Sequence, residues 1–291
     1  LKNRSIMSRI SMQNVSVMTV QYWHYSFEYV LDSIEKCGLK YLELWAGAPH
    51  YTLDDYPDRA SASRQIAKMR RQIEHRGMKV IMLTPEQLNY PFNRAGREEE
   101  YRQKSIRNVA RLMEDALEFG TNRLFVIPGW GLLDEPREEA WKRSVDSVQV
   151  LSKRAEELGV KMVVEQLQPY ESNLVNTCAD MERLLKEVNS EQLEFCVDLV
   201  AMEVVGEKLQ TFFDVLGSRV RHIHLADGNP SGHYILGDGN LPIQEYIDTL
   251  ERNEYTDYLT LEINDSIYWD DPHTSIEKTV NYMRKLIPEV E

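Results

Sequence analysis

The stretch LGVKMVVE, at residues 158–165, contains a helix end, a buried strand and a polar strand terminus in direct succession. Gly159 follows a long charge-rich segment and is typical of the glycine that ends a helix in the left-handed conformation. The Val and Met residues after it are typical of a parallel strand that is buried on both faces. Glu165 then stands where this strand would emerge from the sheet.

The same order of helix end, glycine and apolar strand recurs along the chain. Gly38, Gly77, Gly120 and Gly159 are separated by 39, 43 and 39 residues. A repeat of about 40 residues that contains one strand and one helix is a βα unit. The predicted strands are 11–18, 39–45, 79–84, 122–127, 160–165, 193–198, 220–225 and 257–263. The predicted helices are 26–37, 59–76, 98–119, 136–158, 178–188, 206–216, 242–252 and 273–286.

Eight strands that alternate with helices predict an α/β fold, namely a single (β/α)8 TIM barrel. No low-complexity linker divides the chain, so we expect residues 1–291 to form one domain. An open doubly wound sheet is the structural alternative, but that fold usually begins with a glycine-rich turn. The first loop here, Val20–Tyr25, is aromatic and contains no glycine.

The charge and hydropathy of the chain disfavour some classes of binding partner. The chain has 34 Lys and Arg against 47 Asp and Glu, a net charge of −13. Such a surface repels nucleic acid and anionic lipid, so neither is expected as a partner. No apolar stretch approaches the roughly 20 residues that span a bilayer, and no signal peptide is visible. Cys37, Cys178 and Cys196 show no paired spacing, which is typical of reduced thiols, and we expect a cytoplasmic protein.

Four of the predicted strands end in side chains that bind metals, namely Glu165, Asp198, His224 and Glu262. The carboxyl ends of barrel strands meet at one face, so these side chains should converge. Three carboxylates that lie so close repel one another unless a divalent cation neutralises them. Oxygen ligands with one imidazole suit Mn²⁺, Mg²⁺, Co²⁺ or Zn²⁺. For any one of these residues, an ion-paired strand terminus is the structural alternative.

Several motifs resemble those of the xylose-isomerase-like barrel superfamily of sugar isomerases and epimerases. They are Glu165–Asn173, Val197–Asp198, His222–Asp227 and Thr260–Glu262, and the resemblance runs from about residue 38 to residue 288. Two further stretches, Thr84–Pro91 and His233–Pro242, are similar to members of the family that epimerise a ketosamine.

The resemblance implies a metal site and a reaction. It places one divalent cation, preferably Mn²⁺, on Glu165, Asp198, His224 and Glu262. It also makes Glu165 and Glu262 the catalytic pair for C3 epimerisation of a ketose, or of a ketosamine such as fructoselysine. One carboxylate removes the C3 proton and the other returns a proton to the opposite face, through an enediolate. Homo-oligomers are common in the family, so a homo-oligomer is expected.

Five residues are candidates for contact with a small-molecule sugar: Glu171, His233, Glu86, Trp130 and His50. Glu171 occupies the place of a family carboxylate that contacts substrate. His233 precedes a Gly-Asp-Gly turn that could cover the site, although a plain turn is the alternative. For Glu86, Trp130 and His50, loop or core packing is an equal explanation.

Two more polar residues lie near these candidates. Glu43 and His50 are expected to flank the loop after the second strand, where they could line a sugar pocket or simply pack. His222 shares a strand face with His224, because residues two apart point the same way, and is expected to be a buried hydrogen-bonded partner.

Two positions depart from the family pattern. Ala201 stands where many of these epimerases have a substrate-binding His, and Pro230 stands where they have an Arg. The first change favours a non-standard ketose over tagatose or psicose. Residues 226–241 contain no Lys or Arg, so an unphosphorylated sugar or sugar conjugate is expected.

Other functions remain open. A lyase on the same metal scaffold, of the C-glycoside deglycosidase or inosose dehydratase type, would expel a group from the same enediolate. Such a deglycosidase would work with a small partner subunit. The aromatic residues Tyr22, Trp23, Tyr25 and Trp130 are compatible with a flat aglycone. A non-catalytic sugar-binding barrel is a third possibility.

Overall fold

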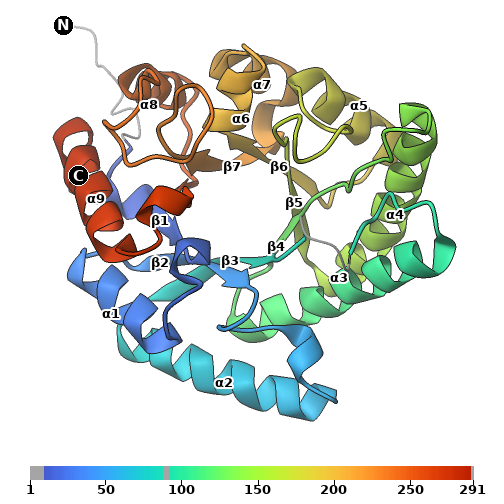
Figure 1. The fold of residues 1–291 in the computed structure, drawn as a ribbon, viewed down its shortest axis with the longest axis horizontal. Helices are drawn as coiled ribbons and strands as arrows, with labels where there is room; N and C mark the ends of the chain where they lie inside the picture. The colour runs from blue at the N-terminus through green and yellow to red at the C-terminus, as the bar shows by residue number, and fades with distance from the viewer. Residues whose placement is uncertain (1–9, 88–91, 290–291) are drawn as a thin grey trace, which may run out of the picture.

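A computed structural model describes residues 10–87 and 92–289 of the chain. Its strands form a closed parallel barrel in the order β1 to β8, with β8 paired to β1 (Figure 1). The strands are β1 Val15–Met18, β2 Tyr41–Ala46, β3 Lys79–Pro85, β4 Arg123–Val126, β5 Lys161–Glu165, β6 Leu193–Asp198, β7 Val220–Leu225 and β8 Tyr258–Leu261. The predicted (β/α)8 barrel is confirmed.

The helices form the outer layer around this barrel. They are α1 Phe27–Lys36, α2 Arg59–His75, α3 Glu99–Phe119, α4 Arg137–Leu158, α5 Cys178–Val188, α6 Leu199–Val204, α7 Leu209–Leu216, α8 Ile243–Arg252 and α9 Pro272–Leu286. The extent of one domain over residues 1–291 stays a prediction. Leu88–Pro91, part of the Thr84–Pro91 motif, lie outside the described residues.

Local sequence signals explain where several helices begin and end. Gly120 and Gly159 follow α3 and α4 with φ of 91° and 69°, in the left-handed conformation that glycine adopts without steric cost. At the start of α5, Thr177 accepts a hydrogen bond from the Asp180 backbone N–H in a capping box.

The structure differs from the predicted elements before β1 and after β6. The first strand begins at Val15, because Ser11 caps a short 3-10 turn over Met12–Asn14. A short helix, α6, follows β6 immediately and was not predicted. It forms because the Asp198 side chain accepts hydrogen bonds from the backbone N–H groups of Val200 and Ala201.

The side chains that point into the barrel divide into an apolar half and a polar half. From β3 to β6 and the loops after β4 and β5, an apolar cluster fills the interior: Met82, Phe125, Ile127, Val163, Leu167 and Cys196. On the other side the buried inward residues are polar and hydrogen-bonded to one another: Ser16, Glu43, Thr84, His222 and Thr260. The polar half lies directly beneath His224, at the carboxyl end of β7.

An ion-pair network closes the amino-terminal end of the barrel. Arg123 at the start of β4 contacts Glu194 on β6 at 3.1 Å and Asp257, just before β8, at 3.3 Å. The three side chains are only 12–15% exposed. The network therefore joins three strands at the face opposite the strand ends that carry Glu165 and Asp198.

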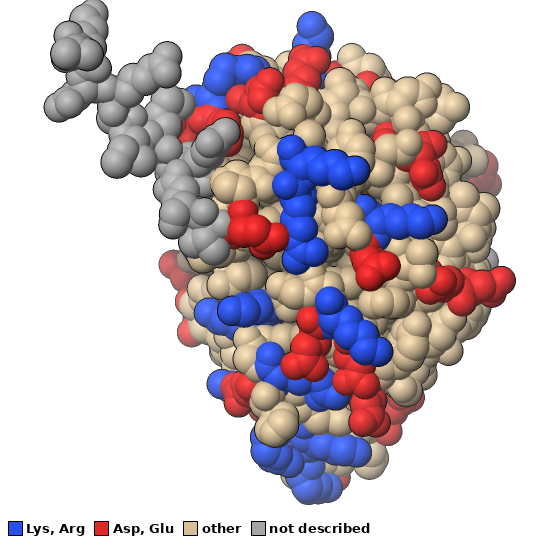
Figure 2. Space-filling view, turned by 90° about the vertical axis from the view of Figure 1, so that its left-hand side faces the viewer, with Lys and Arg blue, Asp and Glu red and all other residues tan. Residues whose placement is uncertain are grey.

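Charge on the outer surface is mixed. Figure 2 shows one side of the molecule, where Lys and Arg are interspersed with Asp and Glu instead of gathered into one basic field. Over the described residues, no helix has both the length and the apolar character needed to cross a membrane.

Replacing Arg123 tests the closing network. Arg123→Met should lower the free energy of unfolding by about 3 kcal/mol, because Glu194 then loses its ion-pair partner in a largely buried place and Asp257 keeps only Arg221. Urea denaturation measures the change. Lys142→Met is the matched control, since Lys142 is 69% exposed and should change stability by less than about 0.5 kcal/mol. Equal effects of the two substitutions would contradict the role of the network.

Candidate metal centre

Four side chains meet at the carboxyl ends of the last four strands. Glu165 ends β5, Asp198 ends β6, His224 lies in β7 and Glu262 follows β8. Each offers one ligand atom, and these atoms all lie within 4.8 Å of one another. The exposed fractions of the four residues are only 1–8%. The structure thus brings together the four residues that the sequence proposes as metal ligands.

The ring of His224 is held from both sides. Its Nε2 lies 3.1 Å from both carboxylate oxygens of Glu43, which is fully buried. A carboxylate only accepts, so Nε2 carries the hydrogen and donates it to Glu43. Nδ1 contacts Oε1 of Glu165 and lies 3.0 Å from Oε2 of Glu262. Burial lowers the pKa of His224, but Cys196, Glu43, Glu165 and Glu262 outweigh it and raise this pKa, so without a cation Nδ1 also carries a hydrogen, which a bound cation would replace. His224 therefore presents a metal-binding nitrogen to the carboxylates.

Two of the other proposed ligands, Asp198 and Glu262, also use one oxygen for support and leave one for the cluster. Asp198 Oδ1 accepts from the N–H groups of Val200 at 2.6 Å and Ala201 at 3.0 Å, which leaves Oδ2 toward His233. Glu262 Oε1 accepts from Nδ2 of Asn264 at 3.2 Å, and Oε2 faces His224. Second bonds of this kind orient ligating carboxylates.

The electrostatics of the metal-free cluster show why it needs a counter-charge. Burial raises the pKa of Glu165 to about 8, against the opposing effect of His224, and the charges of Glu262 and Asp198 add to the rise. Burial lowers the pKa of His233, but Asp198 and Glu262 outweigh it and raise the pKa to about 10. Carboxylates this close cannot all stay ionised without added positive charge.

Two buried atoms in the cluster, His224 Nδ1 and Glu262 Oε2, make charged contacts but no hydrogen bond of regular geometry among the described residues. Both belong to the proposed ligand set and lie 3.0 Å apart. A buried polar atom without a well-formed hydrogen bond requires an explanation, and an ion that binds both atoms is one. Three carboxylates and one imidazole nitrogen, once that nitrogen has lost its proton, fit a divalent cation of the Mn²⁺, Mg²⁺, Co²⁺ or Zn²⁺ type.

Two of the candidate substrate residues lie at the edge of this cluster. His233 Nε2 is 3.0 Å from Asp198 Oδ2 and 3.5 Å from Glu262 Oε2. His233 also lines a polar recess with Tyr170, Asn229, Ser231 and Asp265. Glu171 Oε2 accepts from the N–H of Gln168 at 2.8 Å, and burial, with the charges of Asp198 and Glu262, raises its pKa to about 7.

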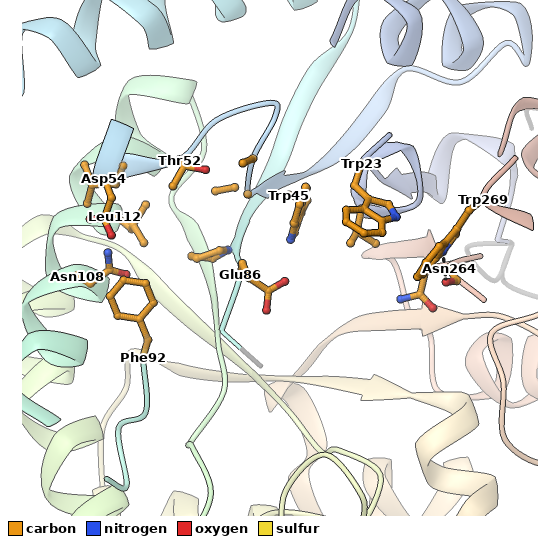
Figure 3. A pocket seen from close by; sticks show the side chains of 16 residues that line it. Trp23, Trp45, Thr52, Asp54, Glu86, Phe92, Asn108, Leu112, Asn264 and Trp269 are labelled. Carbon is orange, nitrogen blue, oxygen red and sulfur yellow. Dashed lines mark hydrogen bonds between the residues drawn. The ribbon is translucent and has the colours of Figure 1, made fainter. Parts of the chain in front are cut away.

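A second, larger pocket opens beside the cluster and has a volume of about 520 Å³. Asn264, the partner of Glu262, lines both this pocket and the polar recess. Its walls near Asn264 are the indoles of Trp23, Trp45 and Trp269, and Glu86 lies between this end and the far end (Figure 3). Phe92, Asn108, Leu112 and Asp54 surround the far end.

The structure places two other candidates away from this pocket lining. His50 Nε2 lies 2.9 Å from the carbonyl oxygen of Tyr25, and the His50 ring packs edge-on against Trp45. Trp130 is held through its backbone by the side chain of Asn93. Roles of His50 and Trp130 in binding a sugar stay predictions.

Sequence analysis missed the position of Glu43. It was expected to flank the loop after β2, but this is wrong: Glu43 is the third residue of β2 and lies inside the barrel against His222 and His224. A usable signal was present, because Glu43 is the one charged residue in the apolar run YLELWA, at 41–46. A charge in a buried strand requires a partner. His222, as expected, is buried and hydrogen-bonded.

Comparisons with known proteins agree on the family to which the chain is similar. Residues 31–286 match the family model described as xylose isomerase-like TIM barrel. The chain is 29% identical over 266 residues to fructoselysine 3-epimerase of Escherichia coli O157:H7, covering 91% of this chain and 94% of that protein. It is 25% identical over 199 residues to 3-dehydro-D-guloside 4-epimerase of E. coli K12, covering 64% and 72%. The predicted resemblance to this superfamily, and within it to fructoselysine 3-epimerase, is confirmed.

Solved structures show the same fold. The crystal structure of D-psicose 3-epimerase with D-tagatose from Clostridium cellulolyticum H10 superposes with a TM-score of 0.77 at 18% identity. The match covers 94% of this chain and 99% of that one.

Metal removal tests the cluster directly. Stripping the protein with a chelator should lower its melting temperature, because the carboxylates then lose their counter-charge. Adding Mn²⁺ at about 100 times its Kd should restore roughly 5–10 °C. Differential scanning fluorimetry measures the shift.

The Glu262→Gln variant should lose most of that Mn²⁺-dependent shift, whereas Glu138→Gln, on the outer helix α4, should keep it. A melting temperature that does not respond to any of the four cations would contradict the proposed centre.

Proposed function

The chain belongs to the xylose isomerase-like TIM barrel family, and from this premise we propose that it is a divalent-metal-dependent sugar epimerase acting at C3 of a ketose or ketosamine. The observation that carries the proposal is the placement of two carboxylates about one point. Glu165, on β5, and Glu262, after β8, approach His224 Nδ1 from strands on either side of β7. Two carboxylates about one reacting centre suit proton removal and return on opposite faces.

The chemistry requires an acid and a base but no redox step. The proton on C3 of a 2-ketose is weakly acidic because it lies next to the carbonyl. One glutamate takes this proton as the C3–H electrons move to the carbonyl oxygen, which gives an enediolate. The other glutamate, in its acid form, then gives a proton to the opposite face of C3. When bound, a divalent cation supplies Lewis-acid stabilisation of the negative charge that develops on the sugar oxygens.

The polar recess supports binding of the sugar hydroxyls. His233 stands beside Asp198 and Glu262, and Ser231 and Asn229 line the same recess. These donors and acceptors would fix the ketose against the catalytic pair. Ser231 Oγ also donates to Oε1 of Gln168 at 2.8 Å, so the loop after β7 is tied to the loop after β5.

The larger pocket supports a substituted sugar over a free ketose. Its lining is mainly apolar and aromatic, and it begins at Asn264, next to Glu262. The names of two relatives, fructoselysine 3-epimerase and 3-dehydro-D-guloside 4-epimerase, both describe sugar conjugates. Among the described residues that line the pocket, Lys, Arg and His are absent, which disfavours a phosphorylated substituent.

Exchange of the carbon-bound proton tests the reaction. The Mn²⁺-loaded protein, mixed in D₂O with a panel of ketoses, ketosamines and sugar conjugates, should place deuterium at C3 of its substrate, as read by NMR. Glu165→Gln and Glu262→Gln should each lower kcat by about 10²- to 10⁴-fold, because each loses one proton-transfer group. Glu138→Gln should retain the wild-type rate. Turnover without exchange at C3 would exclude this mechanism.

A lyase acting on a sugar conjugate is the second candidate function, and the Trp-lined pocket is the observation that favours it. Three indoles beside the metal cluster could hold a flat aglycone. The same NMR experiment separates the two, because a lyase yields a product that lacks its substituent or one molecule of water. A deglycosidase would also retain a small partner subunit on purification, whereas the epimerase is expected as a homo-oligomer.

The pocket makes a separate prediction about substrate size. Trp23→Ala should raise KM about tenfold for a conjugated substrate, because the substituent loses an aromatic wall. It should change KM for an unsubstituted ketose by less than about twofold. Trp23 is 37% exposed, so the fold should tolerate the change. Steady-state kinetics with matched substrates measures both values, and equal effects on them would contradict a substituent in the pocket.

A further inference from the structure

A single buried carboxylate lies beneath the metal cluster. Glu43 has no exposed surface, and an unpaired charge in such a place is strongly unfavourable. Three partners satisfy it: His222 Nε2 at 2.7 Å, His224 Nε2 at 3.1 Å and the Thr84 hydroxyl at 2.7 Å. Glu43 therefore joins the polar half of the barrel interior to the ring of one proposed ligand.

The strand register brings Thr84 of β3 within reach of Glu43. Pairing between β2 and β3 shifts by one residue between Leu42 and Glu43, so that Glu43 lies opposite Met82, where regular pairing would place Ile81. Irregularities of this kind re-aim side chains and are common near active sites. Thr84, two residues beyond Met82, then donates to Glu43 Oε1.

A chain of hydrogen bonds between side chains of other strands holds Glu43 in place. His222 Nε2 lies 2.7 Å from Glu43 Oε2 and 2.9 Å from the hydroxyl of Thr260, which contacts the hydroxyl of Ser16 at 2.5 Å. These side chains come from β7, β8 and β1, so the position of Glu43 is fixed by strands around half of the barrel. Glu43 has little freedom to move away from His224.

The geometry points to Glu43 as a positioning residue of the metal centre. It holds a hydrogen of His224 on Nε2, keeps Nδ1 directed at Glu165 and Glu262 as the nitrogen that would bind the cation, and adds a negative charge behind the imidazole that would strengthen this nitrogen as a donor. Glu43 touches neither substrate nor cation in this role. The inference rests on the proposed function, because it requires that the cluster binds a cation.

Measuring the affinity for Mn²⁺ tests this role of Glu43 independently of catalytic activity. Isothermal titration of the metal-stripped protein with Mn²⁺ should give a Kd about tenfold weaker for Glu43→Gln, which keeps an acceptor but loses the charge. Glu43→Leu, which loses both, should weaken the Kd about 100-fold. An unchanged Kd in Glu43→Leu would overturn the assignment.

Asp115→Asn provides a matched control. Asp115 is also fully buried and binds Tyr51 and Arg59, but it lies in α3, in the outer layer. The Asp115→Asn substitution should lower the melting temperature and leave the Mn²⁺ Kd within twofold of wild type. An equal loss of affinity in Asp115→Asn would show that general destabilisation, and not the position of Glu43, weakens the metal site.

A measurement on the wild-type chain covers the case in which the Glu43 variants do not fold. NMR of the ¹⁵N-histidine-labelled, Zn²⁺-loaded protein should show the His224 hydrogen on Nε2, with Nδ1 bound to the cation. The opposite tautomer would overturn the inference. Failure of the wild-type protein to bind any divalent cation would instead refute the proposed function, so the two failures are distinguishable.

Discussion

Burial of three carboxylates at one point is the constraint on which the rest of this structure depends. Glu165, Asp198 and Glu262 are at most 8% exposed, and their oxygens lie within 4.8 Å of one another. Water cannot solvate them there, and their mutual repulsion raises the cost of ionisation. A protein folds around such a cluster only if positive charge enters it, either as protons on neighbouring histidines or as a cation. We propose the cation, because three carboxylates and one imidazole offer four ligand atoms within 4.8 Å of one another.

The barrel accommodates this constraint through an uneven interior. The apolar cluster of Met82, Phe125 and Val163 fills one side, while hydrogen-bonded polar residues occupy the other side, beneath His224. Three of the four proposed ligands use one atom for support: His224 is held by Glu43, Asp198 by the start of α6, and Glu262 by Asn264. The supports hold the remaining atoms toward a common centre. They also link that centre to Asn264 and hence to both pockets in which a sugar and its substituent would lie.

The features that could be predicted from the sequence are those encoded by short stretches of neighbouring residues. Helix-ending glycines such as Gly159 and the apolar runs after them predicted the βα units, and the polar residue at each strand end predicted the cluster. Features that depend on contacts between distant segments escaped prediction. The role of Glu43 depends on contacts with His222 and His224, about 180 residues away along the chain, and on a register shift in β3 that brings Thr84 beside it. The helix α6 is a local feature that escaped prediction, because Asp198 was assigned only a ligand role and not that of a helix cap. The large pocket is assembled from Trp23, Trp45 and Trp269, which belong to three separate loops or strands.

The most direct test of the metal centre is diffraction from crystals of the Mn²⁺-loaded protein, measured on both sides of the manganese absorption edge. We predict one strong anomalous peak within bonding distance of Glu165, Asp198, Glu262 and Nδ1 of His224, with Nε2 of His224 still bonded to Glu43. Absence of a peak at this position, or a peak bound by side chains from another part of the molecule, would contradict the account.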